Sequence, residues 1–151
     1  MGYSESLEKI FAGRWIAGAR VEDAVREAKK FNRIGVKAII NYLGEEFQRE
    51  EDAKEAIAKI KEAIRAIKSG RVNADISVKP TQLGLLVSEQ LFASNLRMIL
   101  REAKKFGIFV WIDMEEPETV GKVVRLYSKE FSGNGVGICI QSYLKRSAGD
   151  L

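Results

Sequence analysis

Apolar segments of this sequence lead directly to three polar residues that could do chemistry: Lys79, Asp113 and Gln141. Parallel α/β sheets bind their ligands at the carboxyl ends of the strands, so these side chains would stand on one rim. A lysine there can hold a carboxylate or a phosphate, or form a Schiff base if it is desolvated. The pattern therefore predicts an active-site rim.

Each of these residues also has a structural interpretation, and the sequence leaves both open. Lys79 precedes Pro80, which favours extended backbone and stops a strand, so Lys79 could be a solvated strand-end lysine. Asp113 could serve the first turn of the helix expected after it, and Gln141 could bond a neighbouring backbone group instead of a ligand. Glu45, at the end of an earlier apolar segment, is by itself best interpreted as a surface acid.

The chain has no histidine and a single cysteine, which excludes several kinds of site. Without histidine it cannot build a serine or cysteine triad, an imidazole base or a histidine metal site. One cysteine allows neither an intrachain disulfide nor a cysteine-rich zinc site. Cys139 lies inside an apolar run, so we expect a buried core residue rather than a reactive thiol. The glycine-rich residues 133–137 precede a strand, whereas the glycines of a dinucleotide-binding fingerprint follow a strand and precede a helix. We therefore reject a dinucleotide-binding motif here.

Helical and strand patterns alternate along the chain and would position these residues. Apolar residues at helical spacing predict helices over residues 5–14, 21–33, 50–68, 88–105 and 117–131. Apolar runs predict strands over residues 36–43, 74–78, 108–113 and 136–142. Gly70 is expected to cap the long third helix, and Gly107 to end the fourth.

This alternation, after a helical lead, predicts an α/β fold of parallel βα units. Four such units make about half of a TIM-type (βα)8 barrel, which normally needs about 250 residues. We expect one domain over residues 1–151, with a helical lead over residues 1–34 and a partial barrel over residues 35–151. Because a four-stranded parallel sheet leaves two edges exposed, the chain is an open sheet, a half that pairs with another half, or a fragment.

The composition is that of a soluble globular protein, with 46% hydrophobic and 30% charged residues. No apolar run approaches the roughly 18–20 residues that span a bilayer, and no signal-peptide pattern opens the chain, so we expect a cytoplasmic protein. The net charge of +4 is modest, and basic residues alternate with acids along the helices. We therefore expect no nucleic-acid partner.

Taken together, the strand ends resemble the proline dehydrogenase family, flavin-dependent enzymes built on a distorted (βα)8 barrel. The matching stretches, which occur in the family's order, are residues 15–18, 41–45, 76–84, 110–115 and 138–146. The resemblance covers nearly the whole chain. It implies FAD as cofactor and the oxidation of L-proline to pyrroline-5-carboxylate, with hydride transfer from the substrate to the flavin.

The resemblance also implies a role for four residues. Lys79 matches the lysine that contacts the substrate carboxylate, and Glu45 matches the acid that pairs with a substrate-binding arginine to gate the site. Asp113 matches the acid that shapes hydrogen bonding beside the flavin, and Gln141 matches a glutamine that hydrogen-bonds its isoalloxazine ring. The chain departs from the family pattern at Asn41, where the family usually has an acid.

The family's later segments supply a flavin-binding arginine and paired arginines that clamp the substrate carboxylate, and this sequence has no counterpart of them. We therefore expect a truncated or half-barrel form that is inactive alone, and either a homo-oligomer or a second half-barrel chain as partner. Two other hypotheses stay open. One is a non-catalytic oligomeric scaffold or binding protein, and the other is a different barrel enzyme that uses Lys79 as a Schiff-base lysine.

Overall fold

The structure is a computed structural model that describes residues 16–150 of the chain. The helix expected over residues 5–14 lies outside the described residues. The elements follow one another as α2 (Val21–Arg33), β1 (Ala38–Asn41), α3 (Glu50–Gly70), β2 (Ala74–Val78), α4 (Glu89–Phe106), β3 (Val110–Ile112), α5 (Pro117–Leu126), the π-helical segment η1 (Tyr127–Phe131), β4 (Val136–Ile138) and α6 (Ser147–Asp150).

The four strands form one parallel sheet in the order β1-β2-β3-β4. The registers align Asn41 with Ser77, and Val78 with Ile112 and then Ile138, so the strands end at nearly the same level. This confirms the predicted α/β fold of parallel βα units. The division into a helical lead and a partial barrel stays a prediction.

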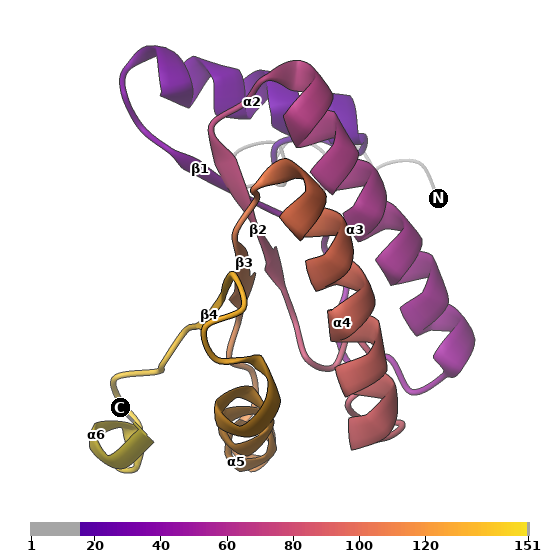
Figure 1. Cartoon of the computed structure of the whole chain (residues 1–151), viewed down its shortest axis with the longest axis vertical. Coiled ribbons are helices and arrows are strands. Elements are labelled where there is room, and N and C mark those ends of the chain that lie inside the picture. Colours follow the sequence, from indigo (N-terminus) through magenta and orange to yellow (C-terminus); the bar gives the residue numbers. More distant parts are fainter. Residues whose placement is uncertain (1–15, 151) are drawn as a thin grey trace, which may run out of the picture.

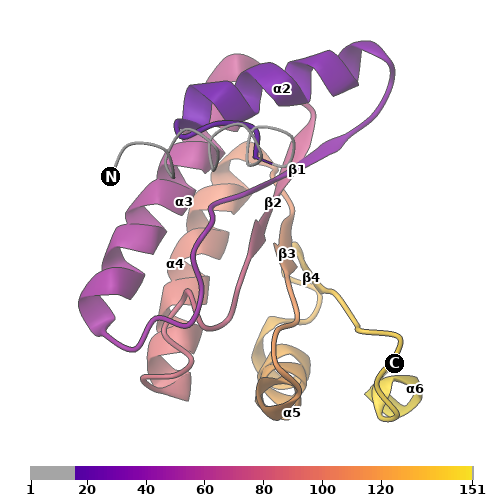
Figure 2. The ribbon, with the colours of Figure 1, turned by 180° about the vertical axis from the view of Figure 1, so that it is seen from behind.

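Helices α3 and α4 lie side by side along one face of the sheet (Figures 1 and 2). Helix α2 lies across the end where the strands begin, and α5 lies beyond the end where they finish. Among the described residues, no helix covers the other face along β1, β2 and β3. We call this uncovered side the helix-free face.

The core fills the space between α3, α4 and the sheet. Its members are apolar residues at helical spacing on the two helices and at alternate positions on the strands, which is the pattern each element needs to bury one side. The largest fully buried of them are Phe92, Ile60, Ile64, Ile67, Ile76, Leu83, Leu96, Ile99, Ile112, Val78 and Val110. Strand residues of opposite parity, such as Asp75 and Ser77, lie on the helix-free face.

The ends of the two long helices show which capping predictions were right. Ser88 begins α4, and its Oγ accepts a hydrogen bond from the Leu91 backbone N–H at 3.0 Å. Gly107 ends that helix in the left-handed conformation, with a φ of 68°, as predicted. The prediction for Gly70 is wrong, because Gly70 is the last residue of α3 and Arg71 takes the left-handed position with a φ of 51°.

The strands are shorter than the apolar runs predicted, apart from β2. Pairing of β3 ends at Ile112 because the chain then turns toward Pro117, whose preceding residue Glu116 is the N-cap of α5. Among the described strands β4 pairs only with β3, and this pairing ends at Ile138 instead of continuing over residues 139–142. The predicted helix over residues 117–131 is α5 followed directly by η1.

Candidate functional site

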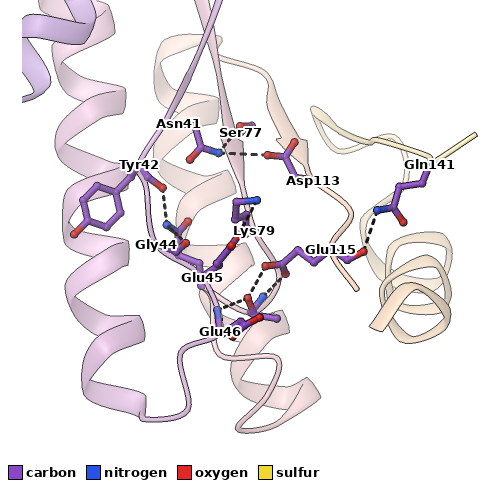
Figure 3. Close-up of polar contacts among 12 residues, drawn as sticks. Asn41, Tyr42, Gly44, Glu45, Glu46, Ser77, Lys79, Asp113, Glu115 and Gln141 are labelled. Atoms are coloured by element: carbon purple, nitrogen blue, oxygen red, sulfur yellow. Dashed lines mark hydrogen bonds and ion pairs between the residues drawn. The ribbon is translucent and has the colours of Figure 1, made fainter. Parts of the chain in front are cut away.

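The carboxyl ends of the first three strands meet in a polar cluster on the helix-free face (Figure 3). Asn41 at the end of β1 donates from Nδ2 to the Ser77 Oγ at 2.7 Å and to the Asp113 Oδ2 at 3.3 Å. A carboxylate only accepts, so the NH2 group of Asn41 faces Asp113 and its Oδ1 faces elsewhere. Asp113 does not cap α5 and is available to this cluster.

Lys79 and Glu45, two of the predicted site residues, form an ion pair beside this cluster. Lys79 Nζ lies 3.0 Å from Glu45 Oε2, and the lysine side chain is 23% exposed against 57% for the glutamate. Burial lowers the pKa of Lys79, but the hydrogen bond and charge of Glu45 and the charges of Glu115 and Asp113 outweigh it and hold that pKa above its usual value. Lys79 is therefore a firmly protonated cation surrounded by three carboxylates.

Glu115 completes the carboxylates around Lys79, and the sequence pattern did not identify it as a site residue. Its Oε2 accepts the Thr81 backbone N–H at 2.8 Å, and its Oε1 accepts the Thr81 hydroxyl at 2.5 Å. Desolvation raises the pKa of Glu115, although the Thr81 hydrogen bonds and the Lys79 charge act in the opposite direction. Its distance of two residues from Asp113, on the same rim, was the signal available in the sequence.

Gln82 is a second residue that the pattern did not identify as part of the site. Its side chain is fully buried, and its Nε2 donates to the Tyr42 carbonyl at 2.7 Å and to the Gly44 carbonyl at 3.0 Å. An amide that follows a strand and a proline is the only sign of it in the sequence. The contact ties the turn after β2 to the segment that carries Glu45.

Gln141 does not join Lys79, Glu45 and Asp113. It lies beyond the end of β4, and its Nε2 donates to the Glu115 backbone carbonyl at 3.0 Å, apart from Lys79 in Figure 3. The prediction that Gln141 lies at the end of a strand is therefore wrong, because β4 ends at Ile138. Three buried amide oxygens have no hydrogen-bond partner among the described residues: Asn41 Oδ1, Gln82 Oε1 and Gln141 Oε1.

Cys139 is exposed, so the prediction of a buried core residue is wrong. Its Sγ lies 3.7 Å from the Asp113 Oδ1. Partial desolvation and the nearby Asp113 carboxylate raise the pKa of the thiol. The raised pKa keeps Cys139 a thiol, which is a weaker nucleophile than the thiolate.

Other kinds of site find no support within residues 16–150. No cluster of three histidine, cysteine, aspartate or glutamate side chains in this range could hold a metal ion. No helix of the described chain is long and apolar enough to cross a membrane. Two surface hollows lie between α2 and α3 and beside the start of β2, away from the polar cluster.

Sequence comparison identifies relatives of known name. The family model for proline dehydrogenase matches residues 24–151. Proline dehydrogenase 1 of Bacillus subtilis is 38% identical over 146 residues, which cover 95% of this chain and 48% of the relative. Proline dehydrogenase of Deinococcus radiodurans is 29% identical over 145 residues, 92% of this chain and 47% of the relative. The chain thus spans about half the length of these curated relatives.

Solved structures agree on the fold. Proline utilization A from Bdellovibrio bacteriovorus, inactivated by N-propargylglycine, superposes with a TM-score of 0.73 at 21% identity, covering 89% of this chain and 17% of that protein. A mutant of proline utilization A from Bradyrhizobium japonicum gives a TM-score of 0.67 at 22% identity, covering 87% and 15%. With the family model matched over most of its length, the chain belongs to the proline dehydrogenase family.

Proposed function

We propose that this chain is the part of an FAD-dependent proline dehydrogenase that binds the substrate carboxylate, and that it oxidises L-proline to pyrroline-5-carboxylate only when the rest of the fold is supplied. The observation that supports this most directly is Lys79. It is a partly buried cation at the carboxyl end of β2, held by Glu45 and surrounded by further carboxylates. A cytoplasmic location is part of the same proposal.

The charge of Lys79 favours carboxylate binding over a Schiff base. A Schiff-base lysine must present a neutral amine, which enzymes obtain by lowering the lysine pKa. Here the neighbouring carboxylates raise the pKa of Lys79, so the ammonium form dominates near neutral pH. An ammonium group suits the carboxylate of an amino acid. The pairing of Lys79 with the Glu45 carboxylate supports this assignment.

The residues on the rim also suit a flavin. Gln141 Oε1 is buried without a partner among the described residues, and a flavin ring edge carries an N–H that could satisfy it. Asp113 lies at the end of β3 and still has acceptor capacity beside its bond from Asn41. We assign Asp113 and Gln141 to the cofactor on this basis. When bound, the flavin would accept the hydride from the substrate, while these side chains orient it.

A further segment must complete the site. The chain spans about half the length of its curated relatives, and the helix-free face leaves Ile39 56% exposed beside the polar cluster. We propose that the segment present only in the relatives covers this face and that, together with the four-stranded sheet of this chain, it makes a closed barrel. Pairing of two copies of this chain, or an oligomeric scaffold without catalysis, are the alternatives that the experiment below separates.

The test combines this chain with the complementary half of the Bacillus subtilis relative. We expect the purified chain alone to show no proline:dye turnover, and the mixture to turn yellow with bound flavin and to oxidise proline. Lys79→Met should raise the KM for proline in the mixture, whereas Lys68→Met, which removes an exposed lysine of α3, should not. Turnover by the chain alone, or a mixture that binds neither flavin nor proline, would contradict the proposal.

A further inference from the structure

We infer that Thr81 and Gln82 are positioning residues that hold Glu45 against Lys79, with Glu115 fixing the orientation of Thr81. The side-chain hydrogen bonds of Thr81 and Gln82 go to other groups of the described chain and not to the side chains of Lys79 and Glu45. They act through the backbone on either side of Glu45. The structural part of this inference stands on contacts within the described chain, and its consequence for substrate binding rests on the proposed function.

The segment that carries Glu45 needs outside support. It connects β1 to α3 without regular secondary structure, and it contains Gly44 at a φ of 143° and Glu46 at a φ of 59°. A left-handed φ is unfavourable for a glutamate, so surrounding contacts must hold it. The ion pair alone cannot do this, because Glu45 is 57% exposed and ion pairs with exposed partners contribute little.

The turn after β2 supplies that support on both sides of Glu45. Gln82, fully buried, donates to the backbone carbonyls of Tyr42 and Gly44, which precede Glu45. Thr81, 4% exposed, accepts the backbone N–H of the following residue, Glu46, at 2.8 Å. Glu45 is therefore held between two anchored neighbours.

Glu115 orients the Thr81 hydroxyl so that its oxygen can accept a hydrogen bond from Glu46. The Thr81 hydroxyl has one proton, and it donates that proton to the Glu115 carboxylate at 2.5 Å. Its lone pairs are then free to accept from the Glu46 N–H. A second bond, from the Thr81 N–H to Glu115 at 2.8 Å, fixes the turn itself. Loops after β1, β2 and β3 are joined through this one threonine.

The arrangement sets the charge that a substrate would meet at Lys79. Three carboxylates face that ammonium group: Glu45 from the loop after β1, and Glu115 and Asp113 from the loop after β3. Of these, Glu45 is the most exposed and depends on the anchors described above. Releasing Glu45 would remove its contribution and let the pKa of Lys79 fall, since partial burial acts in that direction.

The test measures the pKa of Lys79 without substrate or cofactor. Lysine amines carrying ¹³C-methyl groups are titrated by NMR, and Lys79→Arg assigns the signal. Thr81→Val should lower the pKa of Lys79 toward the value found in Glu45→Gln and speed hydrogen exchange at Glu46 at least tenfold. Thr81→Ser keeps the hydroxyl and should restore both values.

Asn32→Ala is the matched control. Asn32 also ties backbone segments together through its side-chain amide, bonding Val36 and Asn73, but at the opposite end of the sheet. It should lower stability and leave the Lys79 titration unchanged. Gln82→Met removes the other anchor, the hydrogen bonds to the Tyr42 and Gly44 carbonyls, and should also lower the pKa of Lys79. It tests the inference if Thr81→Val does not fold.

An unchanged Lys79 pKa and unchanged exchange at Glu46, in whichever of these two variants folds, would overturn the inference. A folded Thr81→Ser that behaves like Thr81→Val would overturn the part assigned to the hydroxyl. Because no proline or flavin is present, these outcomes are distinct from failure of the proposed function. That function would fail if the completed enzyme did not bind proline, whatever the titration shows.

Discussion

The chemistry of this site depends on how much charge the rim places around one lysine. Partial burial favours a neutral Lys79, whereas three carboxylates favour the ammonium form, and the carboxylates dominate. Glu115 is itself partly desolvated, which raises its pKa. Its proton is therefore held more tightly in the folded chain than in the unfolded chain, and this difference links its ionisation to stability.

Glu115→Gln tests that link through the pH dependence of unfolding. A raised folded pKa gives stability that is fully present below the ordinary glutamate pKa of about 4.3 and is lost as the pH rises through the folded value. Glutamine does not ionise and loses nothing in this range. We expect the difference in free energy of unfolding to shift in favour of Glu115→Gln as the pH rises through this window, measured by urea denaturation at several pH values.

The control for this titration is Glu116→Gln, which removes an equal charge from the exposed neighbouring residue. We expect only Glu115→Gln to change how the free energy of unfolding depends on pH. If both variants track the parent chain in parallel from acid to neutral pH, the ionisation of Glu115 does not affect folding.

At the scale of elements, the sequence pattern predicted what depends on periodicity and missed what depends on contacts across loops. The positions of Lys79 and Asp113 at strand ends could be predicted, because the apolar pattern indicates where each strand stops. The Thr81–Glu115 bond joins residues 34 apart, and the Gln82–Tyr42 bond joins residues 40 apart. No local pattern carries that pairing, so the residues that organise the rim emerged only from the structure.

Errors at β4 have a related cause. The apolar run continues to Ile140, but a strand needs a paired neighbour, and β3 ends at Ile112. The residues that follow therefore leave the sheet, with Cys139 exposed and Gln141 bonded to the Glu115 backbone. A hydrophobic pattern reports which residues prefer burial, but the length of the neighbouring strand decided which were buried here.

The turn between β2 and α4 should tolerate substitution poorly at Gly84. Gly84 has a φ of 91°, and a Cβ there would lie 2.6 Å from the Leu91 Cδ2. Gly107 is the matched control, because it has a φ of 68° and no heavy atom within 4 Å of an added Cβ. Both alanine variants bear a backbone cost of about 1–2 kcal/mol.

Gly84→Ala should cost a further 1–3 kcal/mol or so, since Leu91 must move at the start of α4. Guanidinium unfolding of the two variants measures this difference directly. Equal midpoints would show that Leu91 rearranges freely, and that the turn does not depend on the close contact.

On the scale of the whole molecule, the helices of the described residues cover one face of the sheet, and none of them covers the other. On that helix-free face, Trp111 donates from Nε1 to the buried Asp75 at 3.1 Å and packs closely over Gly137. Asp75 also pairs with Lys37 at 2.7 Å. These contacts give the polar groups of Asp75 and Trp111, in the middle of the face, partners within the chain. Ile39 on the edge strand β1 stays 56% exposed.

An exposed edge strand with an apolar residue favours association with another chain. Because the relatives are about twice as long, we expect the complementary half of the fold to cover this face, and the isolated chain to self-associate weakly in its absence. Ile39→Lys should reduce self-association in sedimentation velocity and weaken binding of the complementary half. Ile34→Lys, at a residue 74% exposed in the turn before β1, should change neither. The expectation is wrong if the parent chain is monomeric and the Ile39→Lys variant binds the complementary half as tightly as the parent does. In that case the two halves meet elsewhere.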